Sequence, residues 1–292
     1  MLKRLGSSHH GTVSALALFL LSGLLLLPLL FGTFKQTDAP TVPNRYVFRG
    51  SSPAPRMPAA LHSIAGELRI RQWHYVPDLE VELAQFETVF WEPDDTTSLR
   101  RRIATDSRLQ GAVALEIGTG TGLIASALAI AGAQRVVATD VNPRAVANAL
   151  YNLQNLGLDD RVEVRYVSPS DPGPFSTVAD DEQFDFIISN PPWEDAPVES
   201  PAAYALYDPQ FQLLDGILEQ SSRHLRPNGE LWLAYGAKTA IRRVLERAHE
   251  TGWDVEVDDP RHLDELPEVF LPGMLLKLSR RSEAQAEADV IN

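Results

Sequence analysis

Three glycines stand close together after a short apolar run. The run reads VALEI, and Gly118, Gly120 and Gly122 follow it in an E-x-G-x-G-x-G spacing that begins at Glu116. Glycine lets a backbone turn tightly and approach a ligand closely, and a helix that starts after the turn directs its N–H groups to the same place. The nicotinamide or flavin spacing would need a glycine where Leu123 stands. We therefore predict a ligand-binding turn of another type, with a purely structural turn as the alternative.

An acidic residue ends the next apolar run. The segment RVVATD closes with Asp140, 18 residues after Gly122. A carboxylate at this place can accept hydrogen bonds from both ribose hydroxyls of a bound adenosine, as it does for dinucleotides. The alternative is that Asp140 or Asn142 caps a helix that begins at Pro143.

The tetrapeptide Asn190-Pro191-Pro192-Trp193 follows a later apolar run, FDFIIS. Two prolines stiffen the backbone and remove two N–H donors, so that the Pro191 carbonyl can point into a site. The Asn190 side-chain oxygen is a second acceptor, and Trp193 offers a flat face for stacking. Two acceptors can hold both protons of one NH2 group and aim its lone pair at an electrophile, which favours methylation of nitrogen. The structural alternative is a Pro-Pro loop with a core tryptophan.

These residues need a scaffold that brings distant segments together, and the apolar pattern predicts one. Apolar runs predict seven strands, over 113–117, 135–140, 161–167, 184–189, 230–235, 253–257 and 274–278. Helical patterns lie between them, over 123–131, 143–156, 208–225 and 239–251, and a Pro-Asn-Gly turn is expected over 227–229. This alternation predicts an α/β fold, a Rossmann-like, doubly wound, mostly parallel sheet of seven strands. Ligands of such sheets bind at the carboxyl ends of the strands.

At this point the chain resembles a known family. The motifs LEIGTGTG (115–122), VVATDVNPRAV (136–146) and FDFIISNPPW (184–193) resemble those of class I S-adenosylmethionine (SAM)-dependent methyltransferases. Within that superfamily they are similar to the small-domain N-methyltransferases typified by the HemK/PrmC glutamine methyltransferases. The segment VFWEPDDTTSL (89–99) resembles the family's entry segment more weakly. The resemblance covers about two thirds of the chain.

The resemblance implies SAM as cofactor and a role for each matching residue. Glu116, Gly118, Gly120 and Gly122 would line its methionine part, Asp140 would bind the ribose, Asn142 would lie beside the adenine, and Asp171 would reach the adenine amino group. Asn190 and Pro191 would hold the acceptor nitrogen within the catalytic set Asn190, Pro191, Pro192 and Trp193, and Pro93, Asp95 and Thr96 would cover the pocket.

The chain departs from the family in three places. Trp193 stands where the glutamine methyltransferases usually have tyrosine, which bears on the substrate more than on the reaction. Residues 32–88 contain no convincing counterpart of the helical substrate domain, and an N-terminal membrane anchor is not typical of the family.

Charge and composition narrow the choice of substrate. The 292 residues carry a net charge of −13, and residues 90–292 alone carry 33 acids against 18 bases. Nucleic-acid affinity comes largely from neutralising phosphates, so a protein side-chain amide such as glutamine is the expected acceptor. The alternative acceptors are a nucleic-acid base and a small molecule. A different alternative is that the chain is a non-catalytic, membrane-tethered SAM-binding protein. The absence of cysteine excludes thiolate chemistry, and His62, His74, His224 and His262 show no metal-ligand spacing.

The remaining segments predict how the chain is organised. Residues 13–31 contain no charge over 19 positions and predict a transmembrane helix, with a cleaved signal peptide as the alternative. Because SAM is made in the cytosol, the catalytic domain is expected on the cytosolic side of a single-pass anchor. The expected divisions are a short basic N-terminus (1–12), the anchor (13–31), a Pro-rich linker (32–60), an N-terminal extension (61–88) with a short helix within 58–75, a methyltransferase domain (89–280) and a disordered tail (281–292).

Overall fold

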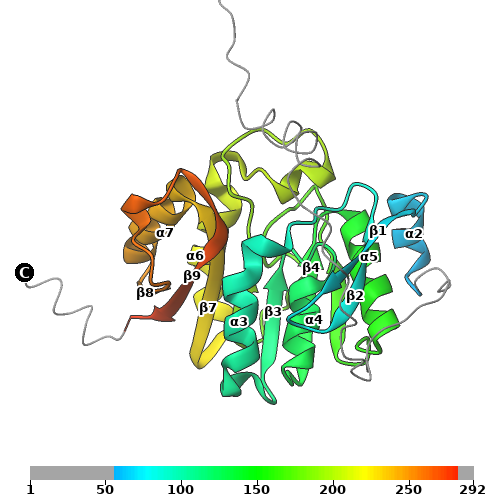
Figure 1. Cartoon of the computed structure of the whole chain (residues 1–292), viewed down its shortest axis with the longest axis horizontal. Coiled ribbons are helices and arrows are strands. Elements are labelled where there is room, and N and C mark those ends of the chain that lie inside the picture. Colours follow the sequence, from blue (N-terminus) through cyan, green and yellow to red (C-terminus); the bar gives the residue numbers. More distant parts are fainter. Residues whose placement is uncertain (1–55, 282–292) are drawn as a thin grey trace, which may run out of the picture. The chain divides into compact units, whose positions relative to one another are not determined.

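The computed structural model describes residues 56–281, and a seven-stranded sheet forms the centre of this part of the chain (Figure 1). Four neighbouring pairs of strands, β5–β4, β4–β3, β3–β6 and β6–β7, are parallel, and β9 is antiparallel to both of its neighbours. In spatial order the strands are β5 (Val162–Tyr166), β4 (Arg135–Asp140), β3 (Val113–Ile117), β6 (Phe184–Ser189), β7 (Leu225–Ala237), β9 (Val269–Arg280) and β8 (Trp253–Asp258). The predicted Rossmann-like, mostly parallel α/β fold is therefore confirmed.

Successive side chains of the strands pack on opposite faces of this sheet, which explains why the central strands are apolar throughout. On β3, Ala114 belongs to a core shared with α3, α4 and α5, whereas Leu115 belongs to a core shared with α6 and α7. The helices of the first face are α3 (Thr97–Thr105), α4 (Leu123–Ile130) and α5 (Pro143–Leu156), and those of the second are α6 (Gln212–His224) and α7 (Lys238–Glu250).

The order of the strands places the candidate residues at one edge. The chain moves outward from β3 through β4 to β5, then returns to the other side of β3 with β6. Since these strands are parallel, their carboxyl ends meet at the same edge, and ligands bind where the strand order reverses. Register pairs Ile117 with Thr139 on one side and with Ser189 on the other. The next residues along the chain are Gly118, Asp140 and Asn190. These three residues therefore lie next to one another at this edge.

Two regions differ from the sequence-based expectation. The helix expected within residues 58–75 is shorter: α2 spans Ala59–Ala65 and ends at Gly66, and β1 (Ile70–Val76) pairs with β2 (Val81–Phe86) in an antiparallel hairpin. The turn expected over 227–229 lies inside β7, where the register shifts and Asn228 has a φ of 64°. In the hairpin long-range pairing overrides the local pattern, whereas the turn signal at Asn228 survives as an irregularity within β7, between the pairs Phe184–Leu225 and Phe186–Glu230.

Two asparagines of α5 fasten the hairpin to the domain. Asn148 Oδ1 accepts a hydrogen bond from Phe86 N at 2.8 Å, and its Nδ2 donates to Ala84 O at 2.8 Å. Asn152 Oδ1 accepts from Ala84 N at 2.8 Å, and its Nδ2 donates to both Ala84 O and Thr121 O at 2.9 Å. Asn152 thus connects the hairpin with the turn that follows β3.

We expect Asn152→Ala to lower the free energy of unfolding by about 2 kcal/mol, because it leaves buried backbone groups at Ala84 and Thr121 with fewer partners. Urea denaturation followed by circular dichroism measures this loss. Gln154→Ala is the matched control, since among the described residues Gln154 on the same helix bonds only the exposed backbone of Arg56. A loss no larger than that of the control would contradict the fastening role.

The predicted membrane localisation is wrong for the part of the chain that the structure describes. Within residues 56–281, no helix has both the length and the apolar composition needed to cross a bilayer. The helix expected over residues 13–31 lies outside the described residues, as do the expected N-terminus (1–12), most of the linker (32–60) and nearly all of the tail (281–292).

Candidate active site

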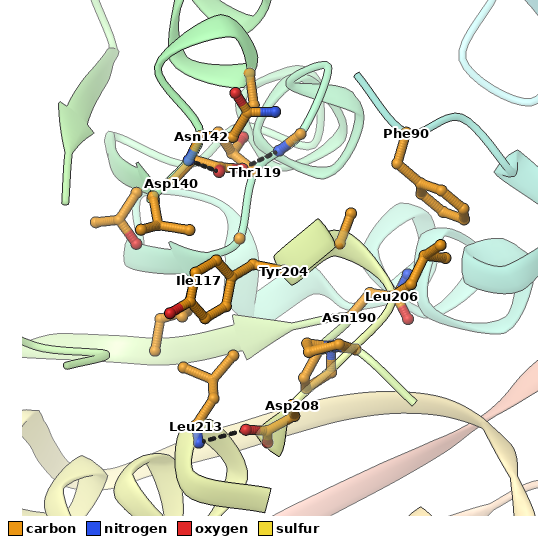
Figure 2. Close-up of a pocket in the computed structure, with 18 of the residues that line it drawn as sticks. Phe90, Ile117, Thr119, Asp140, Asn142, Asn190, Tyr204, Leu206, Asp208 and Leu213 are labelled. Carbon is orange, nitrogen blue, oxygen red and sulfur yellow. Dashed lines mark hydrogen bonds between the residues drawn. The ribbon is translucent and has the colours of Figure 1, made fainter. Parts of the chain in front are cut away.

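A cavity of about 410 Å³ opens at the carboxyl edge of the sheet (Figure 2). It is lined by residues that follow β3, β4 and β6 and by two segments that pack over them, 89–95 and 201–213. Figure 2 shows Asp140 and Asn142 toward one end of the cavity and Phe90, Leu206 and Asn190 toward the other. Of the eleven residues predicted from the sequence for the site, nine line this cavity: Glu116, Gly118, Gly120, Asp140, Asn142, Asn190, Pro191, Pro192 and Trp193.

The turn after β3 leaves its backbone open to the cavity. Gly118 and Gly120 have φ values of 82° and 57°, and a Cβ added to either would meet no atom within 4 Å. Both therefore line free space that a ligand can approach closely. Gly122 has another role, because a Cβ there would lie 3.1 Å from Ala149 Cα, so this glycine permits the close packing of α4 on α5.

Asp140 holds the glycine turn to the start of α5. Its Oδ2 accepts a hydrogen bond from Gly120 N and its Oδ1 accepts one from Asn142 N, both at 2.8 Å. Asn142 Oδ1 accepts from Arg144 N at 3.0 Å, so Asn142 is the N-cap of α5 as well as a lining residue. Burial raises the pKa of Asp140 to about 6, against the lowering effect of these backbone N–H groups.

Glu116 is a buried carboxyl beside the same turn. It is 3% exposed, and its Oε2 accepts a hydrogen bond from Thr119 Oγ1 at 2.7 Å. Burial, and then the nearby charge of Asp140, raises the pKa of Glu116 to about 7, although the Thr119 hydroxyl opposes this shift. The side chain is therefore placed to accept or donate a hydrogen bond at the cavity wall.

Asn190 is held from both sides at the end of β6. Its Nδ2 donates to Asp95 Oδ2 at 2.8 Å, and its Oδ1 accepts from Trp193 Nε1 at 3.3 Å. The strand itself is tied to β3, because Ser189 Oγ donates to Ile117 O at 2.7 Å. The two prolines that follow Asn190 are buried and line the cavity.

Trp193 combines the two interpretations that its sequence allowed. It lines the cavity and also packs, partly buried, against the core on the α6 and α7 side of the sheet. Gly236 on β7 makes room for it, since a Cβ there would lie 2.4 Å from Trp193 Cη2. The ring is thus fixed in place while part of it remains available to a ligand.

Several lining residues were not identified from the sequence. Phe90 and Leu206 are 40% and 42% exposed at the cavity, and Tyr204 lies between the two ends in Figure 2. Asp208 is 2% exposed and accepts hydrogen bonds from Leu213 N and Leu214 N, in the first turn of α6, at 2.9 and 3.0 Å. One sequence signal was available: the connection between β6 and α6 is longer than most, and such loops are often functional.

Asp171 and part of the entry segment (89–99) do not line the cavity. Asp171 is exposed and is not among the lining residues, although Pro172 and Gly173 are. Of the three residues expected to cover the pocket, Asp95 lines it, while Pro93 and Thr96 do not.

Comparison with known proteins adds a family to this geometry. The profile of the methyltransferase small domain family matches residues 94–256. A release factor glutamine methyltransferase of Cereibacter sphaeroides is 39% identical over 153 residues, which cover 47% of this chain and 52% of that protein. A tRNA1(Val) (adenine(37)-N6)-methyltransferase of Pedobacter heparinus is 30% identical over 189 residues, which cover 60% of this chain and 77% of that protein.

Solved structures show the same fold. The crystal structure of a putative methyltransferase complexed with SAH superposes with a TM-score of 0.51 at 16% identity, covering 68% of this chain and 53% of that one. The chain spans only about half the length of the release factor methyltransferase that it matches.

Proposed function

The chain belongs to the methyltransferase small domain family of SAM-dependent enzymes, and we propose that it transfers the methyl group of SAM to a planar NH2 nitrogen, that of a protein side-chain amide such as glutamine. The observation that carries this proposal is a juxtaposition. The glycine turn and Asp140 line one cavity together with Asn190, Pro191 and Trp193.

The residues present fit the proposed cofactor. The open backbone at Gly118 and Gly120 can approach the methionine part closely, since a side chain at either position would project into the cavity. The Asp140 carboxylate lies at the wall where ribose hydroxyls can donate to it. When bound, SAM supplies a methyl group on a sulfonium, which is a strong electrophile.

The chain has to position the nitrogen more than activate it. Asn190 Oδ1 and the Pro191 carbonyl can each accept one proton of the acceptor NH2, which turns the nitrogen lone pair toward the cofactor side of the cavity. Trp193 contributes an aromatic face beside them. Alignment of this kind accounts for a large part of the rate of a two-substrate reaction.

Charge at the cavity favours a protein acceptor. Among the described residues that line it there are six carboxyls and no Lys, Arg or His; the acids are Glu92, Asp95, Glu116, Asp140, Glu194 and Asp208. A phosphate backbone would meet no cation on this lining, whereas nucleic-acid binding depends on such contacts. A neutral amide on a polypeptide does not depend on such a cation.

A nucleic-acid base is the second candidate. It is favoured by the similarity to a tRNA adenine methyltransferase, which covers 77% of that relative. The exocyclic amino group of adenine is also a planar NH2, and the acceptors at Asn190 and Pro191 suit both substrates equally.

Transfer of a tritiated methyl group from SAM to a cell extract tests the proposal. We expect labelled material that resists ribonuclease and deoxyribonuclease and is lost on proteolysis, with the label recovered as a methylated amide side chain by mass spectrometry. Label that disappears with ribonuclease would overturn the amide acceptor and leave the methyltransferase intact. No transfer to protein, nucleic acid or small molecules, despite binding of SAM, would overturn the activity itself.

A further inference from the structure

A buried carboxyl faces the residue proposed to hold the acceptor. Asp95 lies on a short 3-10 helix (Pro93–Thr96), is 4% exposed and lines the cavity. It is 95 positions away from Asn190 in the sequence, yet its Oδ2 accepts the 2.8 Å hydrogen bond from Asn190 Nδ2. Burying a carboxyl is costly unless it is well partnered, so its place beside a substrate-binding residue calls for a reason.

The backbone around Asp95 is held firmly. Arg100, 4% exposed, donates from Nη1 to Pro93 O at 2.6 Å and to Thr96 Oγ1 at 2.7 Å. The same guanidinium is anchored to Asp78 through Nε at 2.6 Å and Nη2 at 3.2 Å. Gly273 on β9 allows the close approach of this segment, because a Cβ there would lie 2.6 Å from Asp95 O. The carboxyl is therefore presented to Asn190 by a braced element.

The two partners of Asn190 require the same orientation of its amide. A carboxylate only accepts hydrogen bonds and an indole N–H only donates them. Asp95 must therefore face Nδ2, and Trp193 must face Oδ1. The indole bond is 3.3 Å long, beyond the usual range for N–H···O, and a carbonyl oxygen has two lone pairs. Oδ1 thus faces Trp193, another residue that lines the cavity, and it keeps acceptor capacity to spare.

We propose that Asp95 is a positioning residue for methyl transfer, whose carboxylate fixes the Asn190 amide so that its oxygen, and not its NH2 group, meets the acceptor nitrogen. This inference rests on the proposed function of Asn190. A flipped Asn190 amide would present its own N–H donors to the substrate NH2 group, whose protons need a hydrogen-bond acceptor. Holding one orientation before the substrate arrives removes that competing state.

The ionisation of Asp95 determines the pH range in which its carboxylate can fix the Asn190 amide. Burial raises its pKa to about 7; the Asn190 hydrogen bond opposes this shift, Glu92 adds to it, and Arg100 and Thr96 oppose it. Above that pH the carboxylate is an obligate acceptor. Below it the carboxyl gains an O–H donor that can turn toward Asn190 Oδ1 and compete for that oxygen.

The first experiment needs no substrate. In the full chain labelled with 15N-asparagine, the Asn190 side-chain resonance is assigned by its loss in Asn190→Ala. We expect it to shift with pH around a midpoint near 7 in the wild type, and not in Asp95→Asn. Asp94→Asn is the matched control, because Asp94 is exposed, adjacent and not among the lining residues. A pH-independent Asn190 resonance, or one that still titrates without the Asp95 carboxyl, would overturn the proposal.

The second experiment separates this inference from the proposed function. With the acceptor identified, we expect Asp95→Asn to lower kcat roughly 10- to 100-fold with unchanged SAM affinity, and the ratio of wild-type to variant kcat to rise with pH through about 7. Glu116 and Asp140 ionise in a similar range, but they are present in both proteins and largely cancel in that ratio. In a double-mutant cycle, Asp95→Asn should add little to Asn190→Ala.

The outcomes are distinct. If Asn190→Ala retains full activity, the function proposed for the tetrapeptide fails. If Asn190→Ala is impaired while Asp95→Asn matches wild type, or if the two losses simply add, only the positioning role of Asp95 fails.

Discussion

Asn190→Ala is expected to lower kcat by roughly 10²- to 10³-fold, the range found when one positioned hydrogen-bonding group of a catalytic site is removed. The substitution deletes Oδ1, one of two acceptors proposed for the substrate NH2, and leaves the Asp95 carboxyl and the Trp193 indole without their shared partner. The glycine turn and Asp140 belong to other strands, so SAM affinity should stay within about twofold of wild type, as it does for independent sites.

Steady-state transfer of labelled methyl groups gives kcat, and isothermal titration with SAM gives the affinity. Asn155→Ala is a suitable control, because Asn155 lies on α5 and is not among the residues that line the cavity. Equal rates for the Asn190 and Asn155 variants would remove Asn190 from the reaction. A parallel loss of SAM binding would instead indicate that the β6 end supports the cofactor.

The central fold could be predicted because its signals are local. The strands of the parallel sheet are buried on both faces, so their apolar runs stand out in the sequence, as 113–117 and 184–189 do. The hairpin could not be read in the same way. Most of β1 is exposed or half-buried, and the hairpin is fastened by Asn148 and Asn152, more than 60 positions away. Long-range hydrogen bonds of this kind leave no periodicity in the sequence.

The place of a site residue could be predicted from the fold where that residue ends a parallel strand. Asp140 and Asn190 each close a strand, and the carboxyl ends of neighbouring parallel strands share an edge. The partner of Asn190 could not be found by that rule, because Asp95 reaches the cavity from a separate 3-10 helix. Gly122 shows the converse limit: its place in the motif suggested a ligand, whereas its backbone is close to Ala149.

Asp140→Ala should raise the Kd for SAM by roughly 10²-fold or more. Hydrogen bonds to a charged group contribute about 1.5–3 kcal/mol each, and the ribose would lose its proposed acceptors. The variant also loses the two 2.8 Å bonds that hold Gly120 N and Asn142 N, which loosens the turn that contacts the ligand. Asp140→Asn keeps one acceptor oxygen and should bind with an intermediate Kd.

The pH dependence of SAM binding tests whether the carboxylate form of Asp140 accepts the hydrogen bonds of the ribose. Because burial raises the pKa of Asp140 to about 6, its carboxylate predominates above that pH and is lost as the pH falls through it, so SAM affinity should weaken in that range in the wild type and less in Asp140→Asn. Asp171→Ala serves as the matched control and as a test of its own, since the family resemblance assigns Asp171 to the adenine while the structure leaves it exposed. If Asp171→Ala weakened binding as much as Asp140→Ala, the adenine would have to reach beyond the cavity described here, and the ribose assignment of Asp140 would no longer account for the affinity alone.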